Sequence, residues 1–308
     1  MYASIDIGSN TILLLVAEWR EGQLTEQKEQ IRVPRLGQGM DENGQLTKQA
    51  IYRASDILAE FKQMVRYEFG KQIPIIVTAT SAVREAENKN ELVEEVKKRT
   101  GLEVKVISGA QEARLTYAGA LTTLRMKQPE SGYVVVDVGG GSTEIIQGHG
   151  KKVNQLRSYP MGSVRFSEKY IHTGYAINQS VANCREAIFQ LLRDPSFDIQ
   201  REHILIGVEG TATSLAYISG DWSNPYHSSL VNGIVLTADE IREFVRWLER
   251  TEPQKLLDLY PEVMKGRADV FLGGVLILEA VMHQFSMENL IISAGGIRHG
   301  AMMEYLRG

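Results

Sequence analysis

The clearest pattern in the sequence is an apolar run that breaks into glycines and hydroxyls and then becomes apolar again. Residues 134–138 are valines apart from Asp137, residues 139–143 read Gly-Gly-Gly-Ser-Thr, and the apolar stretch resumes at Ile145. A short β-branched apolar run is typical of a buried strand. Glycine permits a tight turn and brings bare backbone N–H groups close to an anion, while a carboxylate at the strand end can hold a hydrated metal ion. The pattern predicts a phosphate-binding hairpin.

The same pattern occurs at the start of the chain. Residues 2–7 form a largely apolar stretch that contains Asp6, residues 8–11 read Gly-Ser-Asn-Thr, and residues 12–16 are apolar. Asp6 and Asp137 are 131 positions apart, which is the size of one domain. The sequence therefore predicts a duplicated α/β architecture.

Two hairpins that faced each other across a cleft would surround a phosphate chain with backbone donors. Asp6 and Asp137 would then meet near one divalent cation, bound through water. A simpler explanation is that both carboxylates only cap turns, but such turns do not require three consecutive glycines, which are unfavourable in chain entropy. The expected phosphate ligands in the hairpins are Gly8, Ser9, Asn10, Thr11, Gly139, Gly140, Gly141, Ser142 and Thr143.

Apolar spacing elsewhere predicts alternating strands and helices. Thr47 is the expected N-cap of a helix with apolar residues three and four positions apart, Gly101 is expected to end another helix, and Thr237 with Glu240 has the form of a capping box. Strands are expected at 24–33, 73–79, 104–107, 203–208 and 290–293, and helices at 90–100, 110–126, 178–193 and 266–285.

A polar stretch with Pro and Gly at 127–132 predicts the boundary between two domains. The expected domains are residues 1–126 and 127–308, and a terminal helix at about 297–308 can pack back on the first domain. The 308 residues carry a net charge of −4, which argues against a general nucleic-acid or membrane-surface binder. Cys184 is the only cysteine, so neither an intramolecular disulfide nor a cysteine-based metal cluster is expected, as suits the cytoplasm. We expect no secretion signal and no transmembrane helix.

Taken together, these residues resemble the Ppx/GppA family of exopolyphosphatases and guanosine pentaphosphate phosphohydrolases, within the actin-like ATPase superfamily. The resemblance runs nearly end to end, through residues 5–11, 35–37, 79–88, 107–115, 136–144, 161–165 and 267–270. Sugar kinases and chaperone ATPases share the hairpins but not the runs ATSAVREAEN and ISGAQEARL. The resemblance implies duplicated actin-like (ribonuclease H-like) domains with a cleft between them. It also implies hydrolysis of the terminal phosphate of inorganic polyphosphate or guanosine pentaphosphate, with a homodimer as a family-level expectation.

The resemblance also implies roles for individual residues. Glu112 fills the position of the family's catalytic glutamate, and in-line attack by water needs a base aligned with the terminal phosphorus. Arg84 is the expected electrophile, because a guanidinium grips phosphate oxygens bidentately. Glu144 is expected to hold the nucleophilic or a metal-bound water. The alternatives are an exposed Glu112 favoured by the helix dipole, a surface ion pair of Arg84 with Glu85 or Glu87, and a surface carboxylate at Glu144.

The expected metal is Mg²⁺, with Mn²⁺ as the alternative and room for a monovalent cation as well, and the expected metal ligands are Asp6, Asp137 and Glu144. Three arginines inside family-like motifs are expected to contact the polyanion. These are Arg165, Arg267 and Arg298.

The chain departs from the family's pattern at four positions. Gln111 stands where a second glutamate is common, and Glu209 stands where a small residue is usual near the position of a nucleotide site. Ala294 and His299 replace residues that are usually acidic. These departures weigh against nucleotide or pentaphosphate binding more than against triphosphate hydrolysis.

The first interpretation is therefore a magnesium-dependent phosphoanhydride hydrolase with no nucleic-acid or membrane partner. Two alternatives remain open: a non-catalytic or weakly catalytic polyphosphate or alarmone sensor, and an ATP-using kinase or chaperone-like ATPase. The retained Glu112 favours the hydrolase. The chain looks like a short, two-domain member, whereas long members continue into an additional helical domain, so we expect a preference for short polyphosphate or less processive action.

Overall fold

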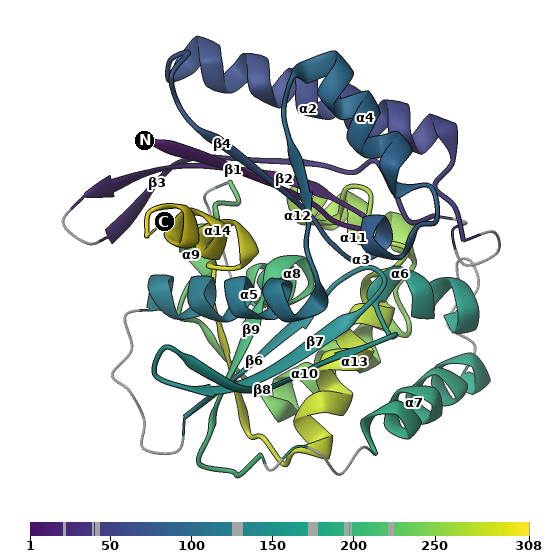
Figure 1. The fold of residues 1–308 in the computed structure, drawn as a ribbon. Helices are drawn as coiled ribbons and strands as arrows, with labels where there is room; N and C mark the ends of the chain where they lie inside the picture. Colours follow the sequence, from purple (N-terminus) through teal and green to yellow (C-terminus); the bar gives the residue numbers. More distant parts are fainter. Residues whose placement is uncertain are drawn as a thin grey trace. The chain divides into compact units, whose positions relative to one another are not determined.

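The computed structural model describes residues 1–20, 23–38, 40, 44–124, 132–171, 178–193, 197, 199–220 and 225–307. The chain divides into two compact units (Figure 1). The first unit comprises Met1–Thr122 and Gly295–Gly308, and the second comprises Thr123–Ala294. Each unit contains one mixed β-sheet with helices, which confirms the predicted α/β fold class. Nearly all of the predicted linker at 127–132 lies outside the described residues.

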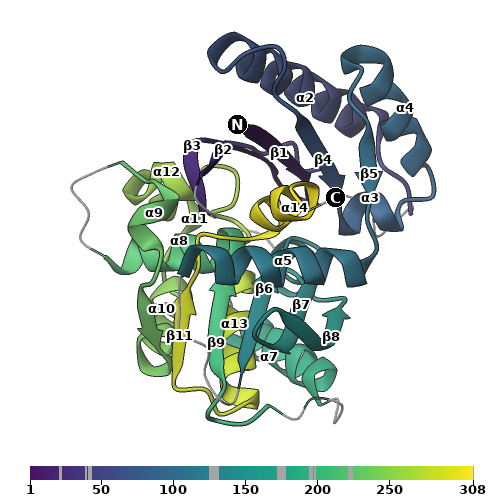
Figure 2. The ribbon, with the colours of Figure 1, turned by 60° about the vertical axis from the view of Figure 1, so that its left-hand side comes forward.

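The first unit is a five-stranded sheet covered on both faces. Its strand order is β3-β2-β1-β4-β5, in which β1, β2 and β3 are antiparallel neighbours and β4 and β5 run parallel to β1. Helices α2 and α4 pack on one face, and α14 packs on the other with α5 against it (Figures 1 and 2). The elements are β1 (Tyr2–Ile7), β2 (Ile12–Arg20), β3 (Gln23–Arg32), α2 (Lys48–Glu68), β4 (Ile75–Ala79), α3 (Ser81–Glu85), α4 (Lys89–Thr100), β5 (Val104–Val106), α5 (Gly109–Leu124) and α14 (Ile297–Tyr305).

The second unit repeats this strand order. Its sheet has the order β10-β11-β9-β6-β7-β8, so that β8-β7-β6-β9-β11 corresponds to β3-β2-β1-β4-β5 in order and in direction. The repeat is what a duplicated architecture predicts. The strands are β6 (Tyr133–Val138), β7 (Thr143–His149), β8 (Lys152–Tyr159), β9 (Ile204–Val208), β10 (Val235–Thr237) and β11 (Asn289–Ile292).

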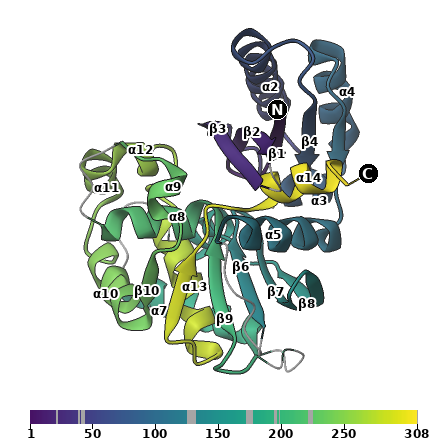
Figure 3. The ribbon, with the colours of Figure 1, turned by 90° about the vertical axis from the view of Figure 1, so that its left-hand side faces the viewer.

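Helix α13 is the centre of the second unit's hydrophobic core, where it packs against the sheet and against α7, α8 and α10 (Figure 3). Cys184 on α7 belongs to this core, and burial raises the pKa of its thiol to about 12. None of the described helices combines the length and apolar composition needed to cross a bilayer. The helices are α6 (Ser163–Phe166), the π-helix η1 (Ser167–Ile171), α7 (Asn178–Leu192), α8 (Glu209–Ser219), α9 (Ser228–Val231), α10 (Ala238–Leu248), α11 (Pro253–Leu259), α12 (Pro261–Met264) and α13 (Phe271–Gln284).

Local helix signals read from the sequence are confirmed. The Thr47 hydroxyl caps α2, Gly101 ends α4 in the left-handed conformation at φ 68°, and Thr237 with Glu240 forms the predicted capping box of α10. The helix expected at 266–285 begins later, at Phe271. Residues 266–270 are turns instead, and Gly266 takes a φ of 75°, which a regular right-handed helix does not contain.

Helices α5 and α14 touch backbone to backbone. A Cβ atom on Gly119 would overlap the carbonyl oxygen of Gly296, and one on Gly300 would overlap the carbonyl oxygen of Leu115. The obstructing atoms are backbone, which cannot move aside as a flexible side chain would. Glycine at these two positions is therefore what allows α14 to lie against α5.

We expect Gly119→Ala to destabilise the protein, because the added methyl group must push the two helices apart. Overpacking of this kind costs roughly 1–3 kcal/mol, and a backbone obstacle belongs at the upper end. Gly109→Ala on the same helix is the control, since its Cβ would meet nothing within 4 Å. Urea unfolding followed by circular dichroism measures the difference. Equal midpoints for the two variants would contradict the close approach.

Candidate functional site

The first predicted hairpin forms a closed turn at the carboxyl end of β1. The amide of Gly8 donates to the carbonyl of Thr11 at 2.9 Å, and the amide of Gly37 donates to the carbonyl of Ser9 at 2.8 Å. The Ser9 and Ser81 hydroxyl oxygens lie 2.9 Å apart, which connects the turn to the start of α3. Ser81 was not expected from the sequence, because the contact joins residues 72 positions apart.

The turn lies beside the carboxyl ends of the neighbouring parallel strands. After β4, the amide of Thr80 donates to the carbonyl of Ile7 at 3.1 Å, and after β5 the amide of Ile107 donates to the carbonyl of Ala79 at 3.1 Å. These bonds place the starts of α3 and α5 next to each other. Ligands of open α/β sheets bind beyond the carboxyl ends of the strands, so this edge is the expected site within the first unit.

Arg84 and Glu112 meet at this edge. Nη1 of Arg84 lies 2.5 Å from Oε2 of Glu112 and also donates to the carbonyl of Ile107 at 3.4 Å. Glu112 is only 7% exposed, so the alternative of an exposed helix-start carboxylate is wrong. The alternative surface ion pair of Arg84 with Glu85 or Glu87 is also wrong, because its partner is Glu112. The expected base and the expected electrophile are thus direct neighbours.

Gln111 has a structural role beside them. The Ser108 hydroxyl accepts from the amide of Gln111 at 3.2 Å, and the Gln111 side-chain oxygen accepts from the amide of Ser108 at 3.2 Å. This reciprocal pair is a capping box that begins α5, and either glutamine or glutamate can occupy its second position. The departure at Gln111 therefore preserves the helix that carries Glu112.

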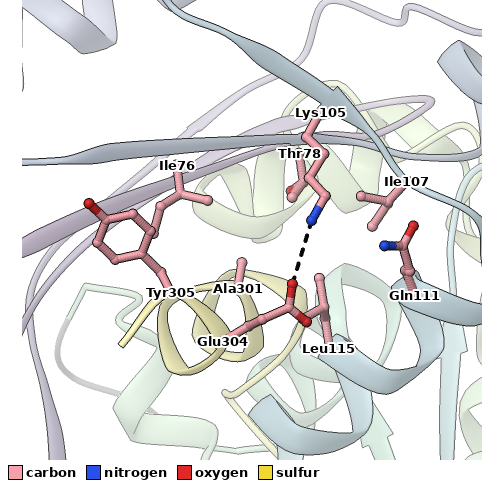
Figure 4. Close-up of a pocket in the computed structure, with 9 residues that line it drawn as sticks. All are labelled: Ile76, Thr78, Lys105, Ile107, Gln111, Leu115, Ala301, Glu304 and Tyr305. Carbon is pink, nitrogen blue, oxygen red and sulfur yellow. Dashed lines mark ion pairs between the residues drawn. The ribbon is translucent and has the colours of Figure 1, made fainter. Parts of the chain in front are cut away.

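A cavity of about 600 Å³ lies next to this helix start (Figure 4). Its lining combines apolar side chains with an ion pair between Lys105 and Glu304, which spans the cavity at 3.5 Å between Nζ and Oε1. Both of these side chains are more than half exposed, so the pair contributes little stability. The lining residues are Ile76, Thr78, Lys105, Ile107, Gln111, Leu115, Ala301, Glu304 and Tyr305.

The second predicted hairpin forms the corresponding turn in the second unit. The amide of Gly139 donates to the carbonyl of Ser142 at 3.0 Å, the same bond as between Gly8 and Thr11, 131 positions later. The amide of Ser163 donates to the carbonyl of Gly139 at 2.8 Å, which ties the start of α6 to the turn. A Cβ on Gly162 would overlap the carbonyl of Gly140, so this approach also requires glycine.

Two side chains of this turn are buried within the second unit. The Thr143 hydroxyl is fully buried and donates to the carbonyl of Met161 at 2.7 Å. While this bond is made, the Thr143 hydroxyl cannot donate to a phosphate, and only the backbone of Thr143 can take its predicted role in phosphate binding. Ser142 is buried as well, at 4% exposure.

Two carboxylates face each other across the strands that flank the turn. Asp137 on β6 is paired in register with Glu144 on β7, and both are nearly buried. The Ser158 hydroxyl on β8 donates to Oε1 of Glu144 at 2.6 Å. The alternative of a surface carboxylate at Glu144 is thus wrong. Like charges directly opposite in a sheet are unfavourable, so the pair suits a nearby cation.

The described part of the chain contains no group of three or more Asp, Glu, His or Cys side chains that could by itself hold a metal ion. Asp6 is nearly buried in the first unit, whereas Asp137 and Glu144 belong to the second. A Mg²⁺ ion held by one or two carboxylates completes its coordination with water and phosphate oxygens. The acidic pair at the second turn fits such a site.

The three arginines that were expected to contact a polyanion have different surroundings. The amide of Arg165 donates to the carbonyl of Gly140 at 3.1 Å, which places this residue beside the glycine turn. Arg267 is half-buried and donates to the Ser214 hydroxyl at 3.3 Å. Arg298 is buried and pairs with Glu29 at 3.0 Å. A phosphate contact by Arg298 would therefore have to break that pair.

The departure at His299 has a structural explanation, whereas the alanine side chain at 294 has none. His299 is fully buried, and its Nε2 lies 2.9 Å from Oε1 of Glu26 on β3. The amide of Ala294 donates to the side chain of Asn232 at 2.9 Å. His299 thus helps to attach α14 to the first unit's sheet, a role that has no sequence signal because its partner is 273 residues away.

We expect Gln111→Ala to lower the free energy of unfolding by about 1 kcal/mol, because it removes the reciprocal bond of the capping box. Gln111→Glu is the matched variant, since a glutamate side chain can accept the same amide hydrogen. Thermal unfolding compares the two with the native protein. A loss in Gln111→Glu as large as in Gln111→Ala would contradict the capping role.

The whole chain is similar to proteins of one family. A sequence model of the Ppx/GppA phosphatase family matches residues 15–307. The crystal structure of the Aquifex aeolicus member of the Ppx/GppA protein family is 30% identical, covers 99% of this chain and 97% of that one, and has a TM-score of 0.81. An exopolyphosphatase-like protein is 26% identical, covers 99% and 98% of the two chains, and has a TM-score of 0.88.

A curated relative combines such a region with a second activity. The bifunctional 3-dehydroquinate synthase/phosphatase of Fusobacterium nucleatum is 28% identical over 311 residues, which cover 98% of this chain and 46% of that protein. This chain therefore spans about half of that relative's length. Because the family model covers nearly the whole sequence, the chain belongs to the Ppx/GppA phosphatase family.

Proposed function

We propose that the protein is a phosphoanhydride hydrolase that removes the terminal phosphate of inorganic polyphosphate by metal-assisted attack of water. The observation that carries the proposal is the buried Glu112 at the start of α5, within 2.5 Å of Arg84. Membership of a phosphatase family supports the reaction class. Similarity to an exopolyphosphatase-like protein supports the substrate.

In this proposal Glu112 is the general base. An opposite charge at hydrogen-bonding distance favours the ionised carboxylate, which is the form that can accept a proton. When a terminal phosphate binds, its oxygens compete for the guanidinium of Arg84 and release one oxygen of Glu112 for a water molecule. Arg84 then neutralises charge that develops on the phosphate, while Glu112 orients the water and takes its proton.

The two glycine-containing turns bind the phosphates in this proposal. Gly8, Ser9, Asn10 and Thr11 would contribute from the first unit, and the 139–143 turn with Arg165 and Arg267 from the second. Asp6, Asp137 and Glu144 are the residues that would hold Mg²⁺. The bound ion would neutralise phosphate charge, and its remaining ligands would be water and phosphate oxygens.

Guanosine pentaphosphate is the second candidate substrate, because the family resemblance extends to its phosphohydrolases. Glu209 weighs against it, since this carboxylate lies at the start of α8, near the position expected for a nucleotide. A polyphosphate chain needs no pocket for a base. We therefore place inorganic polyphosphate first.

We expect Glu112→Gln to reduce phosphate release from polyphosphate by roughly 100- to 10,000-fold, the contribution typical of an oriented general base. The amide oxygen of glutamine can still accept from Arg84, so the fold should be retained. Glu91→Gln is the control, because Glu91 is also a first-turn glutamate, but exposed and on α4. Release is measured with Mg²⁺, and again after a chelator removes it.

The same assay separates the alternatives when guanosine pentaphosphate and ATP are added as substrates. Faster phosphate release from guanosine pentaphosphate than from polyphosphate would make guanosine pentaphosphate the preferred substrate. Transfer from ATP that depends on an acceptor would favour a kinase, and binding of polyphosphate without release would favour a sensor. Unchanged activity in Glu112→Gln would refute the role of Glu112.

A further inference from the structure

The turn between β9 and α8 contains a glutamate in a conformation that favours glycine. Glu209 has a φ of 59°, in the left-handed region that residues with a Cβ rarely adopt. Glycines at 207 and 210 stand close by, yet the positive φ falls on the glutamate. Strained backbone persists where surrounding structure requires it, and it is concentrated at functional sites.

A positive charge lies against this turn. The guanidinium of Arg267 packs so closely on Gly210 that a Cβ there would overlap Nη1. Arg267 donates to the Ser214 hydroxyl at 3.3 Å, one turn further along α8. Within the described residues it forms no ion pair with a carboxylate. Burial lowers the pKa of Arg267, and the nearby carboxylate of Glu209 opposes that effect.

The same corner meets the glycine turn of the second unit. The Thr211 hydroxyl donates to the carbonyl of Val138 at 3.1 Å, directly before Gly139. A Cβ on Gly274 of α13 would lie 2.8 Å from the Thr211 side chain and 3.2 Å from that of Ser163. The starts of α6 and α8 therefore converge on the turn that is expected to bind phosphate.

Two positive contributions act at this corner. The first backbone N–H groups of α8 carry the partial positive charge of a helix N-terminus, and Arg267 carries a full one. Glu209 is the first residue of α8 and adds a carboxylate to them without a direct ion pair. Its charge lowers the attraction of the corner for anions, because opposing charges in a partly buried site are only weakly screened.

We propose that Glu209 is a specificity-determining residue whose carboxylate offsets the positive charge of Arg267 and of the α8 N-terminus, and so restrains the binding of polyanions at this corner. The proposal rests on the proposed function in that it assumes a phosphate-chain ligand. It assigns Glu209 no part in the chemical step. In this proposal the strain at position 209 has a function, because glutamate supplies a negative charge there, whereas glycine would relieve the strain but supply no charge.

The expected result follows from removing the charge while keeping the shape of the side chain. Glu209→Gln should tighten binding of polyphosphate by about three- to tenfold at low salt, and the gain should shrink as salt screens the charge. Glu209→Gly should show the same gain and also a higher melting temperature, because glycine adopts a positive φ without strain. A purely structural role would change stability but not the salt-dependent affinity.

Isothermal titration calorimetry with the native chain and four probes tests this: orthophosphate, tripolyphosphate, a longer polyphosphate of fixed length, and ATP. Glu243→Gln is the control, because it removes the same charge from an exposed position on α10. Failure of both Glu209 variants to gain affinity for any probe relative to this control overturns the proposal, and so does a loss of affinity. The titrations contain a chelator in place of Mg²⁺, so that the proposed metal-assisted hydrolysis does not occur while binding is measured. An inactive protein would therefore refute the proposed hydrolysis and leave this inference standing.

Discussion

The 2.5 Å ion pair between Arg84 and the nearly buried Glu112 determines how the candidate site of the first unit is built. A buried carboxylate without a partner is strongly unfavourable, so Glu112 depends on α3 as much as on its own helix. Arg84 also bonds to the carbonyl of Ile107, directly after β5. The pair thus joins the ends of β4 and β5, and the contact between Ser9 and Ser81 attaches the first turn to the same frame.

The two units share a backbone arrangement but not the chemistry of their turns. Both turns close with a bond across four residues, and each follows the central strand of the repeated order, β1 in the first unit and β6 in the second. In the second unit Asp137 faces Glu144, whereas the residue that faces Asp6 in the first unit is Leu13. The ion pair of Arg84 with the nearly buried Glu112 belongs to the first unit and the paired carboxylates belong to the second. The duplication therefore supplies two turns of the same backbone geometry, while the Arg84–Glu112 pair comes from the first unit and the acidic pair from the second.

Features that depend on neighbouring residues could be predicted from the sequence. Both hairpins and the caps at Thr47 and Thr237 are local, since each bond joins residues at most four positions apart. The attachment of α14 could not be predicted in this way. Its Arg298 pairs with Glu29 and its His299 with Glu26, on a strand more than 260 residues earlier.

A β-bulge explains why even a correct strand prediction would miss this attachment. Residues 26 and 29 of a regular strand point to opposite faces. The register shift beside Val16 and Ala17 inserts one extra residue into β3 and brings both glutamates to the face that α14 covers.

The environment of Glu209 could not be predicted from the sequence either. Its charge is evident from the sequence, but its positive φ and its position near Arg267 depend on the packing of α8 against α13. The positive φ of Glu209 and the burial of the Arg267 charge are both unfavourable. The Glu209 carboxylate partly compensates for the buried charge of Arg267, but the backbone strain at Glu209 remains.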